Sequence, residues 1–211
     1  MEGMDTSFPS AVDLKMHMDN YPKRGWFPRF SESTKGNVDY CSGRGGAQMT
    51  PEAIWLEPGD VIPNNPTFPL LLYRGVLKVD DRAAGFEALF RRNGWGNMWR
   101  NGVYPFHHYH SKTHEALGFS IGTATLMLGG PTGLKIEIHA GDAAVLPAGT
   151  GHCRLSASSD FLVVGAYPAG ADYDLCRDEP TPEQMKRIQS LAAPSTDPVT
   201  GGSGGLVALW C

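Results

Sequence analysis

Histidine is concentrated in one part of this 211-residue chain, at spacings that suit metal chemistry. All but one of the seven histidines lie within residues 107–152. Side chains alternate between the two faces of a strand, so His108 and His110 would point the same way. A short turn would bring Glu115 back beside them, and His152 opens another strand after a tight PAGTG turn. Three imidazoles and a carboxylate suit a divalent transition metal and leave coordination positions open for water or substrate.

The other histidines fit this pattern less well. Three of them are interpreted as ordinary surface or core residues, namely His17, His107 and His139. His114 adjoins Glu115, so it is either a structural residue, a replacement ligand or a proton shuttle. His110 and His114 also have the i, i+4 spacing of a zinc-binding helix, but the nearby Gly118 and β-like flanking residues argue against a helix there.

The segments around the histidines are typical of short strands. Between Trp99 and Pro168, turn signals recur at intervals of about ten residues, as in a β-sandwich or barrel. No helical segment intervenes to carry parallel crossovers, so the strands are expected to be antiparallel. The expected strands include MWRNGVYPFHHYH, which contains the histidine pair.

Two helices are predicted outside this region. One spans residues 82–92, with Asp80 or Asp81 as its N-cap and Asn93-Gly94 as its stop. The other begins at Thr181, where Pro182 and Gln184 complete a capping-box pattern. We therefore expect an irregular arm over residues 1–50, a β-barrel over 51–180, and a C-terminal helix and tail over 181–211 that pack on the barrel.

Composition excludes several classes of protein. The formal net charge is -4, and lysine and arginine form no basic stripe, so nucleic acid is not an expected partner. No apolar run is long enough to span a membrane, and the first residues lack the pattern of a signal peptide, which predicts a cytoplasmic protein. The four cysteines are far apart without a CxxC motif, and we interpret them as reduced bystanders.

The residues around the histidines resemble the two motifs of the cupin superfamily. The first motif is matched by Gly102, His108, His110, Glu115 and Gly122, and the second by Gly141, Pro147, Gly149 and His152. Ser156 stands where many cupins have Asn. The segments VIPNNPTFPLLLYRG, WGNMWRNGVYPFHHYHS and GGLVALW look like those of the YjlB-like single-domain cupins, and this resemblance covers residues 55–211.

This resemblance implies an all-β fold, a single jelly-roll barrel (a double-stranded β-helix) with a few peripheral helices. It also implies one metal ion bound by His108, His110, Glu115 and His152. Strand alternation would place further side chains around that ion, namely Tyr104, Phe106, Leu117, Phe119 and Arg154. Among these, Arg154 is expected either to anchor a substrate anion or to pair with Asp142 or Asp160.

The function that follows is a mononuclear metal-dependent enzyme acting on a small organic molecule. Fe(II) is favoured, with Mn, Ni, Zn or Cu as other candidates, and the expected reaction is a dioxygenase-type oxidation. Glu115, Arg154 and Tyr104 are the candidate catalytic residues. Two alternatives stay open: a non-redox isomerase, lyase or decarboxylase, and a metal-stapled binding protein without catalysis. A homodimer is expected, partly because Trp26 and Phe27 offer apolar surface in the arm.

Overall fold

The computed structural model describes residues 49–211, which form two antiparallel sheets and three helices within one compact unit, Gly45–Cys211. The larger sheet has the strand order β1-β2-β7-β4-β9-β3, and the smaller has the order β6-β5-β8. The strands are β1 (Glu52–Ile54), β2 (Leu70–Tyr73), β3 (Trp95–Asn101), β4 (Glu115–Ile121), β5 (Thr123–Leu128), β6 (Leu134–His139), β7 (Ala143–Leu146), β8 (His152–Ala157) and β9 (Leu162–Pro168). The helices are α1 (Arg82–Arg92), α2 (Pro182–Ser190) and α3 (Gly205–Leu209).

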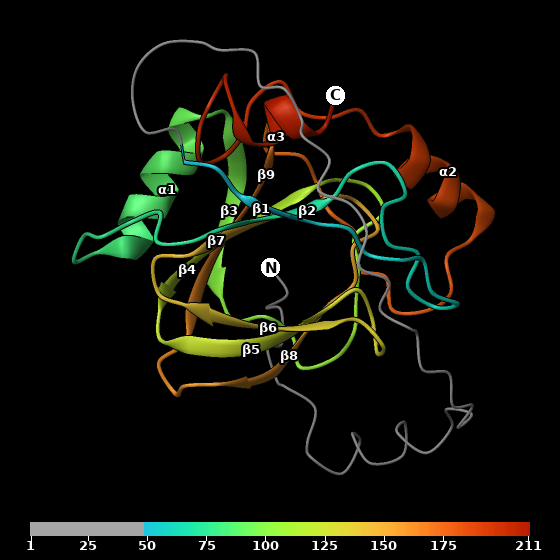
Figure 1. The fold of residues 1–211 in the computed structure, drawn as a ribbon, viewed down its shortest axis with the longest axis horizontal. Helices are drawn as coiled ribbons and strands as arrows, with labels where there is room; N and C mark the ends of the chain where they lie inside the picture. The colour runs from blue at the N-terminus through green and yellow to red at the C-terminus, as the bar shows by residue number, and fades with distance from the viewer. Residues whose placement is uncertain (1–48) are drawn as a thin grey trace, which may run out of the picture. The chain divides into compact units, whose positions relative to one another are not determined.

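The chain passes repeatedly from one sheet to the other. Strand β4 in the larger sheet turns into β5 in the smaller one at Gly122, whose φ of 73° favours glycine. On either side, β7 and β9 pair with β4, while β6 and β8 pair with β5. This winding is a double-stranded β-helix, and Figure 1 shows the smaller sheet facing the larger one. The expectation of an all-β jelly roll with few helices is therefore confirmed.

Each strand of the larger sheet divides its side chains between two cores. In β4, Leu117 and Phe119 join the cluster between the sheets, together with Leu126 and Leu128 from the opposite sheet. The intervening Ala116 belongs instead to the outer cluster under α1. Strand alternation therefore supplies both an interior that receives the functional side chains and an outer face that a helix covers.

Helix α1 covers the outer face of the larger sheet (Figure 1), and its predicted bounds are confirmed. The Asp81 carboxylate accepts a hydrogen bond from the backbone N–H of Ala84 at 3.0 Å, and Asn93 is the C-cap. Phe86 and Phe90 pack against the outer side chains of the sheet. The helix therefore protects from solvent the face of the larger sheet that points away from the smaller sheet.

The C-terminal segment is attached to the larger sheet through buried polar groups. The carboxylate of Asp197 accepts hydrogen bonds from the Tyr73 hydroxyl and from the backbone N–H of Leu206. Trp210 donates from its indole N–H to the Pro69 carbonyl at 2.9 Å. Among residues 49–211, no helix combines the length and the hydrophobicity needed to cross a membrane.

Some sequence-based expectations concern residues that the structure does not describe. Residues 1–48, most of the predicted arm, lie outside the described range, as do His17, Cys41 and the aromatic pair Trp26 and Phe27. The predicted dimer contact of the arm stays a prediction.

Gly118 tests the packing of α1 on the sheet. A Cβ atom at this position would lie 2.4 Å from Cγ of Phe86, so Gly118→Ala must displace the ring or the helix. We expect a loss of about 1–3 kcal/mol in the free energy of unfolding, measured by urea denaturation. Gly202→Ala is the matched control, since nothing lies within 4 Å of its Cβ position. Equal stabilities of the two variants would contradict this account.

Candidate metal centre

The segment that carries His108 and His110 is held against β8 by an isolated bridge. His108 donates its backbone N–H to the His152 carbonyl at 3.2 Å, and His152 donates to the His108 carbonyl at 2.9 Å. The strand predicted through the histidine pair does not form in full. Strand β3 ends at Asn101, and the histidine segment makes only isolated bridges, His108 with His152 and Tyr109 with Cys176. Alternation still applies: Tyr109, between the two histidines, packs on the opposite side with Ile188 of α2.

Three imidazoles converge in this region. Ligand nitrogens of His108, His110 and His152 all lie within 4.8 Å of one another, and all three residues are buried. The ring centroids of His108 and His152 are 3.9 Å apart, and His110 is 5.5 Å from the centroid of His152. Sequence positions 42 or more apart thus meet at one point through the bridge between the His108 segment and β8.

A backbone carbonyl faces the Nδ1 atom of each of these rings. The Phe106 carbonyl lies 3.1 Å from Nδ1 of His108, and the Thr150 carbonyl lies 3.1 Å from Nδ1 of His152. The Asp174 carbonyl contacts Nδ1 of His110. A carbonyl accepts only, so these contacts assign the proton to Nδ1 and leave a lone pair on each Nε2. This is the tautomer that a histidine needs in order to bind a metal through Nε2.

Glu115 supplies an unpaired oxygen beside these nitrogens. Its Oε2 lies 3.4 Å from Nε2 of His110 and 3.4 Å from Nε2 of His152. The residue is only 2% exposed, and Oε2 is a buried atom without a hydrogen-bond partner. An orphaned buried carboxylate oxygen is costly unless a cation compensates it. Three imidazole nitrogens with free lone pairs and this carboxylate oxygen are therefore suitable ligands for a divalent metal ion.

Burial and mutual attraction set the charges at the site. Burial lowers the pKa of His108 to about 2 and, despite the nearby carboxylate of Glu115, the pKa of His152 to about 4. Burial opposes ionisation of Glu115, but its attraction to His110 above all, with smaller effects of His152 and His108, outweighs burial and lowers the pKa of Glu115 to about 2. For His110, burial lowers the pKa, but Glu115 and the Asp174 carbonyl raise it further than burial lowers it. Glu115 is thus an anion that attracts a cation, either a proton on His110 or a metal ion.

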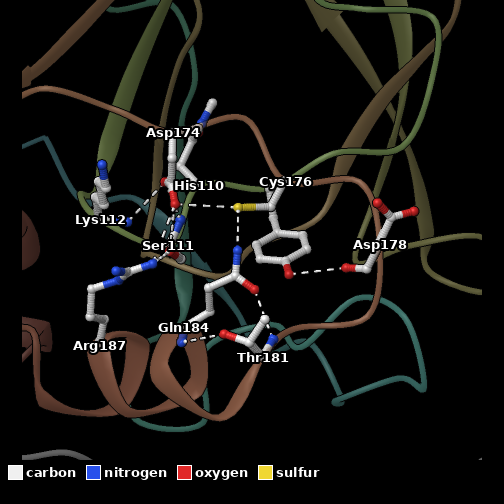
Figure 2. Close-up of polar contacts among 10 residues, drawn as sticks. His110, Ser111, Lys112, Asp174, Cys176, Asp178, Thr181, Gln184 and Arg187 are labelled. Atoms are coloured by element: carbon white, nitrogen blue, oxygen red, sulfur yellow. Dashed lines mark hydrogen bonds and ion pairs between the residues drawn. The ribbon is translucent and has the colours of Figure 1, made fainter.

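Asp174 braces the His110 loop, as Figure 2 shows. Its carboxylate accepts hydrogen bonds from the backbone N–H of Ser111 at 2.7 Å, that of Lys112 at 3.1 Å and the Ser111 hydroxyl at 2.6 Å. Arg187 of α2 donates to the same hydroxyl at 2.9 Å. Asp174, whose carbonyl orients His110, is therefore fixed by three hydrogen bonds, and Arg187 holds the hydroxyl that supplies one of them. No sequence motif pointed to Asp174, because these contacts join segments 63 positions apart.

Helix α2 is linked to the hydrogen bonds of Asp174 through Gln184, a residue of its predicted capping box. Gln184 donates its backbone N–H to the Thr181 hydroxyl at 3.2 Å, and its side-chain oxygen accepts from the backbone N–H of Thr181 at 2.8 Å. The side-chain amide of Gln184 also donates to Sγ of Cys176 at 3.2 Å (Figure 2). Cys176 is a free thiol, but it takes part in this network and is not a bystander.

A small cavity of about 140 Å³ opens beside the imidazoles. Its wall is mostly aromatic and apolar and consists of Trp99, Arg100, Asn101, Gly102, Val103, Tyr104, His108, His110, Glu115, Leu117, Tyr167 and Tyr173. The predictions for Tyr104 and Leu117 therefore agree with the structure. The prediction for Phe119 was wrong, because it packs on Phe161 in the core. Phe106 is also absent from the wall, and its ring stacks on that of Tyr104.

Arg154 is not part of the cavity wall, in contrast to the sequence-based expectation. It follows His152 on β8 by two positions, but its guanidinium extends to the vicinity of Gly102, 3.5 Å from where a Cβ would stand. The predicted pairing with Asp142 was also wrong, since Asp142 binds Arg74 at 2.8 Å. The alternation of strand faces could not reveal where a long, flexible side chain ends.

His114 is a structural residue. Its Nδ1 accepts the backbone N–H of Ala148 at 3.1 Å, and its Nε2 lies 3.2 Å from the Ala192 carbonyl. The ring packs 5.0 Å from that of Trp210. Both ring nitrogens are engaged, so His114 has no lone pair to offer as a replacement ligand. Of the remaining histidines, His139 lies exposed beside Glu137 on β6, and His107 is outside the cluster.

The fold and the site together define a class of protein. A jelly roll that brings histidines from both motifs to one end of its interior is a cupin with a possible three-histidine metal site. No family model matches the chain. The chain belongs to the YjlB-like cupins, since it is 44% identical over 151 residues to the uncharacterized protein YjlB of Bacillus subtilis (strain 168). The match covers 71% of this chain and 90% of that relative.

Two solved structures are also similar, but only weakly. One is a DUF861 family protein from Thermotoga maritima, with 20% identity and a TM-score of 0.26, covering 43% of this chain and 92% of that chain. The other is an uncharacterized protein with a double-stranded β-helix domain from Klebsiella pneumoniae, with 14% identity and a TM-score of 0.29, covering 63% and 89% respectively. Likenesses this weak say nothing about a ligand or reaction of this chain.

The metal assignment has a direct test. We expect protein purified anaerobically to hold about one equivalent of a divalent transition metal, measured by elemental mass spectrometry. His152→Ala should lose most of it, because the variant removes one of three converging nitrogens. His139→Ala is the control and should keep the full amount, since His139 lies away from the cluster. Wild-type protein that binds no metal even after reconstitution would contradict the assignment.

The role of His114 can be separated from that of the cluster. His114→Leu keeps the volume but leaves the buried N–H of Ala148 without an acceptor. We expect a loss of about 1–3 kcal/mol in the free energy of unfolding, with the metal content of the folded protein unchanged. A variant of normal stability that has lost its metal would instead identify His114 as a ligand.

Proposed function

We propose that this chain is an Fe(II)-dependent cupin enzyme that uses dioxygen to oxidise a small, uncharged organic molecule. The observation that carries the proposal is the convergence of three imidazoles and the unpaired Oε2 of Glu115 beside an aromatic cavity, whose wall includes His108, His110 and Glu115. Three neutral imidazoles and one carboxylate compensate only part of the charge of a divalent ion and leave coordination positions open. Fe(II), when bound, supplies the electrons with which dioxygen is activated.

The size of the cavity supports a small substrate. A volume of about 140 Å³ is close to the ~150 Å³ of an engineered cavity that holds a benzene ring. Tyr104 and Tyr173 are 39% and 46% exposed, so they stand where the cavity meets solvent. Trp99 and Tyr167 form the deeper wall. A single ring or a molecule of similar size fits this space, and the aromatic walls exclude water around it.

The charge of the wall supports an uncharged substrate. Arg100 is the one cationic residue in this wall, and its guanidinium is paired with Glu87 at 2.6 Å. Arg154 stands outside the wall. A substrate carboxylate would therefore find no unpaired protein cation in the described cavity. The Tyr104 hydroxyl is available to hydrogen-bond a substrate oxygen.

The titratable groups in the wall favour oxidation over proton-transfer chemistry. Apart from the candidate ligands, the described wall contains only tyrosines and Arg100 as titratable residues. Burial raises the pKa of the Tyr167 hydroxyl, and the charge of Glu115 raises it further, so this group stays protonated. An isomerase or lyase needs a base poised near neutral pH. Glu115 is the one carboxylate in the described wall, and its pKa of about 2 makes it a poor base. An oxidation by dioxygen makes no such demand on the wall.

Oxygen consumption tests the proposal. Anaerobically loaded Fe(II) protein would be mixed with a panel of one-ring phenols, catechols and small hydroxyketones, and dioxygen uptake followed with an electrode. We expect uptake that requires both substrate and metal and that His110→Ala abolishes. Tyr104→Phe should slow it about tenfold, the effect of one lost hydrogen bond of ~1.4 kcal/mol. Arg154→Gln is the control and should stay within twofold.

The other outcomes are distinct. Turnover of a substrate under strict anaerobiosis would replace the proposal with a metal-dependent isomerase, lyase or decarboxylase. A protein that converts no member of a broad panel, and whose His110→Ala variant only lowers the melting temperature, would be a metal-stapled binding protein.

A further inference from the structure

The two oxygens of Glu115 have different surroundings. Oε2 faces the Nε2 atoms of His110 and His152 and has no hydrogen-bond partner. Oε1 instead accepts a hydrogen bond from the Tyr167 hydroxyl at 3.0 Å. The carboxylate is thus held by one oxygen while the other is turned toward the imidazoles. Its orientation depends on the direction in which Tyr167 donates.

Trp99 fixes that direction. Its indole Nε1–H donates to the Tyr167 hydroxyl oxygen at 2.9 Å. An indole N–H is a donor only, so the oxygen of Tyr167 accepts there, and its single proton is directed to Glu115. The chain of hydrogen bonds therefore runs one way, from Trp99 through Tyr167 to the carboxylate.

The backbone makes room for this arrangement. Trp99 of β3 lies opposite Gly165 of β9, and a Cβ atom on Gly165 would stand 2.0 Å from Cε2 of the indole. On its other side Gly165 pairs with Leu117 of β4, so β9 is held between two strands at this position. Tyr167 follows two positions later on the same face and stacks on Tyr173 at 4.8 Å. The absence of one side chain lets the indole reach the tyrosine hydroxyl.

We propose that Tyr167, held by Trp99, is the positioning residue that aims Oε2 of Glu115 at the metal and reserves Oε1 for itself. The inference rests on the metal-dependent function proposed above and extends it to residues outside the predicted ligand set. With Oε1 occupied by a hydroxyl, one oxygen is left for the ion. This keeps more of the coordination sphere free for substrate or dioxygen. Partners that orient a ligand in this way commonly affect metal affinity 10- to 100-fold.

Tyr167→Phe is the direct test, because it removes the hydroxyl and keeps the ring that stacks on Tyr173. The readouts are the dissociation constant for Mn(II), measured by calorimetry on metal-free full-length protein, and the melting temperature of the same metal-free protein. We expect Mn(II) to bind at least tenfold more weakly, with a melting temperature within a few degrees of wild type. A merely structural role would lower the melting temperature and leave the affinity of the folded protein unchanged.

Two further variants complete the experiment. Trp99→Phe breaks the first hydrogen bond and should weaken Mn(II) binding in the same direction but less. It also stands in if Tyr167→Phe does not fold. Tyr173→Phe removes a hydroxyl from the same cavity wall without touching Glu115 and should bind Mn(II) like wild type.

The result separates this inference from the proposed function. If wild type binds Mn(II) and Tyr167→Phe, or Trp99→Phe in its place, binds it within twofold, the positioning role is overturned and the metal site stands. If wild type itself binds neither Mn(II) nor Fe(II), the metal-dependent function falls, and the positioning role falls with it.

Discussion

The site depends on one constraint, the burial of a charged carboxylate away from water. Glu115 is 2% exposed, and an isolated charge at such depth would be strongly unfavourable. The imidazoles of His110 and His152 lie beside one of its oxygens, and a tyrosine hydroxyl holds the other. The proposed metal ion would satisfy the remaining attraction better than a shared proton, since it would also use the lone pairs of the three imidazoles. The same electrostatic demand that makes the carboxylate costly without a cation makes it an effective ligand.

That constraint explains why so much of the structure is devoted to orientation. Each imidazole is held through Nδ1 by a different backbone carbonyl, from three separate loops. The carbonyl of Asp174 is itself fixed, because its side chain binds the backbone that follows His110. Flexible ligands would lose conformational entropy on binding an ion, whereas ligands held beforehand avoid much of that cost. Rigidity around the cluster would therefore contribute directly to the affinity for the proposed metal ion.

The two faces of the larger sheet divide structural and chemical work. Outward-facing Ala116 and Gly118 meet α1, where small side chains let Phe86 approach closely. Inward-facing Glu115 and Leu117, their neighbours on the same strand, line the cavity. A one-residue slip in the pairing of β4 would exchange these roles and turn the carboxylate toward the helix. Close packing of α1 thus protects the register on which the site depends.

Local sequence patterns were sufficient to predict those features that depend on contacts between residues close in the sequence. The caps of α1 and α2 follow from side chains that bind backbone groups within three residues, and alternation along a strand placed His108 and His110 together. The glycine-punctuated strands without intervening helices indicated an antiparallel sandwich or barrel, and the resemblance to the cupin motifs implied the jelly roll. Long-range pairing decided the rest. Tyr167 reaches Glu115 only because β9 pairs with β4, and Asp174 reaches His110 across 64 positions. The cavity wall contains Tyr173, which was not predicted, and lacks Arg154, which was. Side-chain direction depends on packing between distant segments, which no short stretch of sequence encodes.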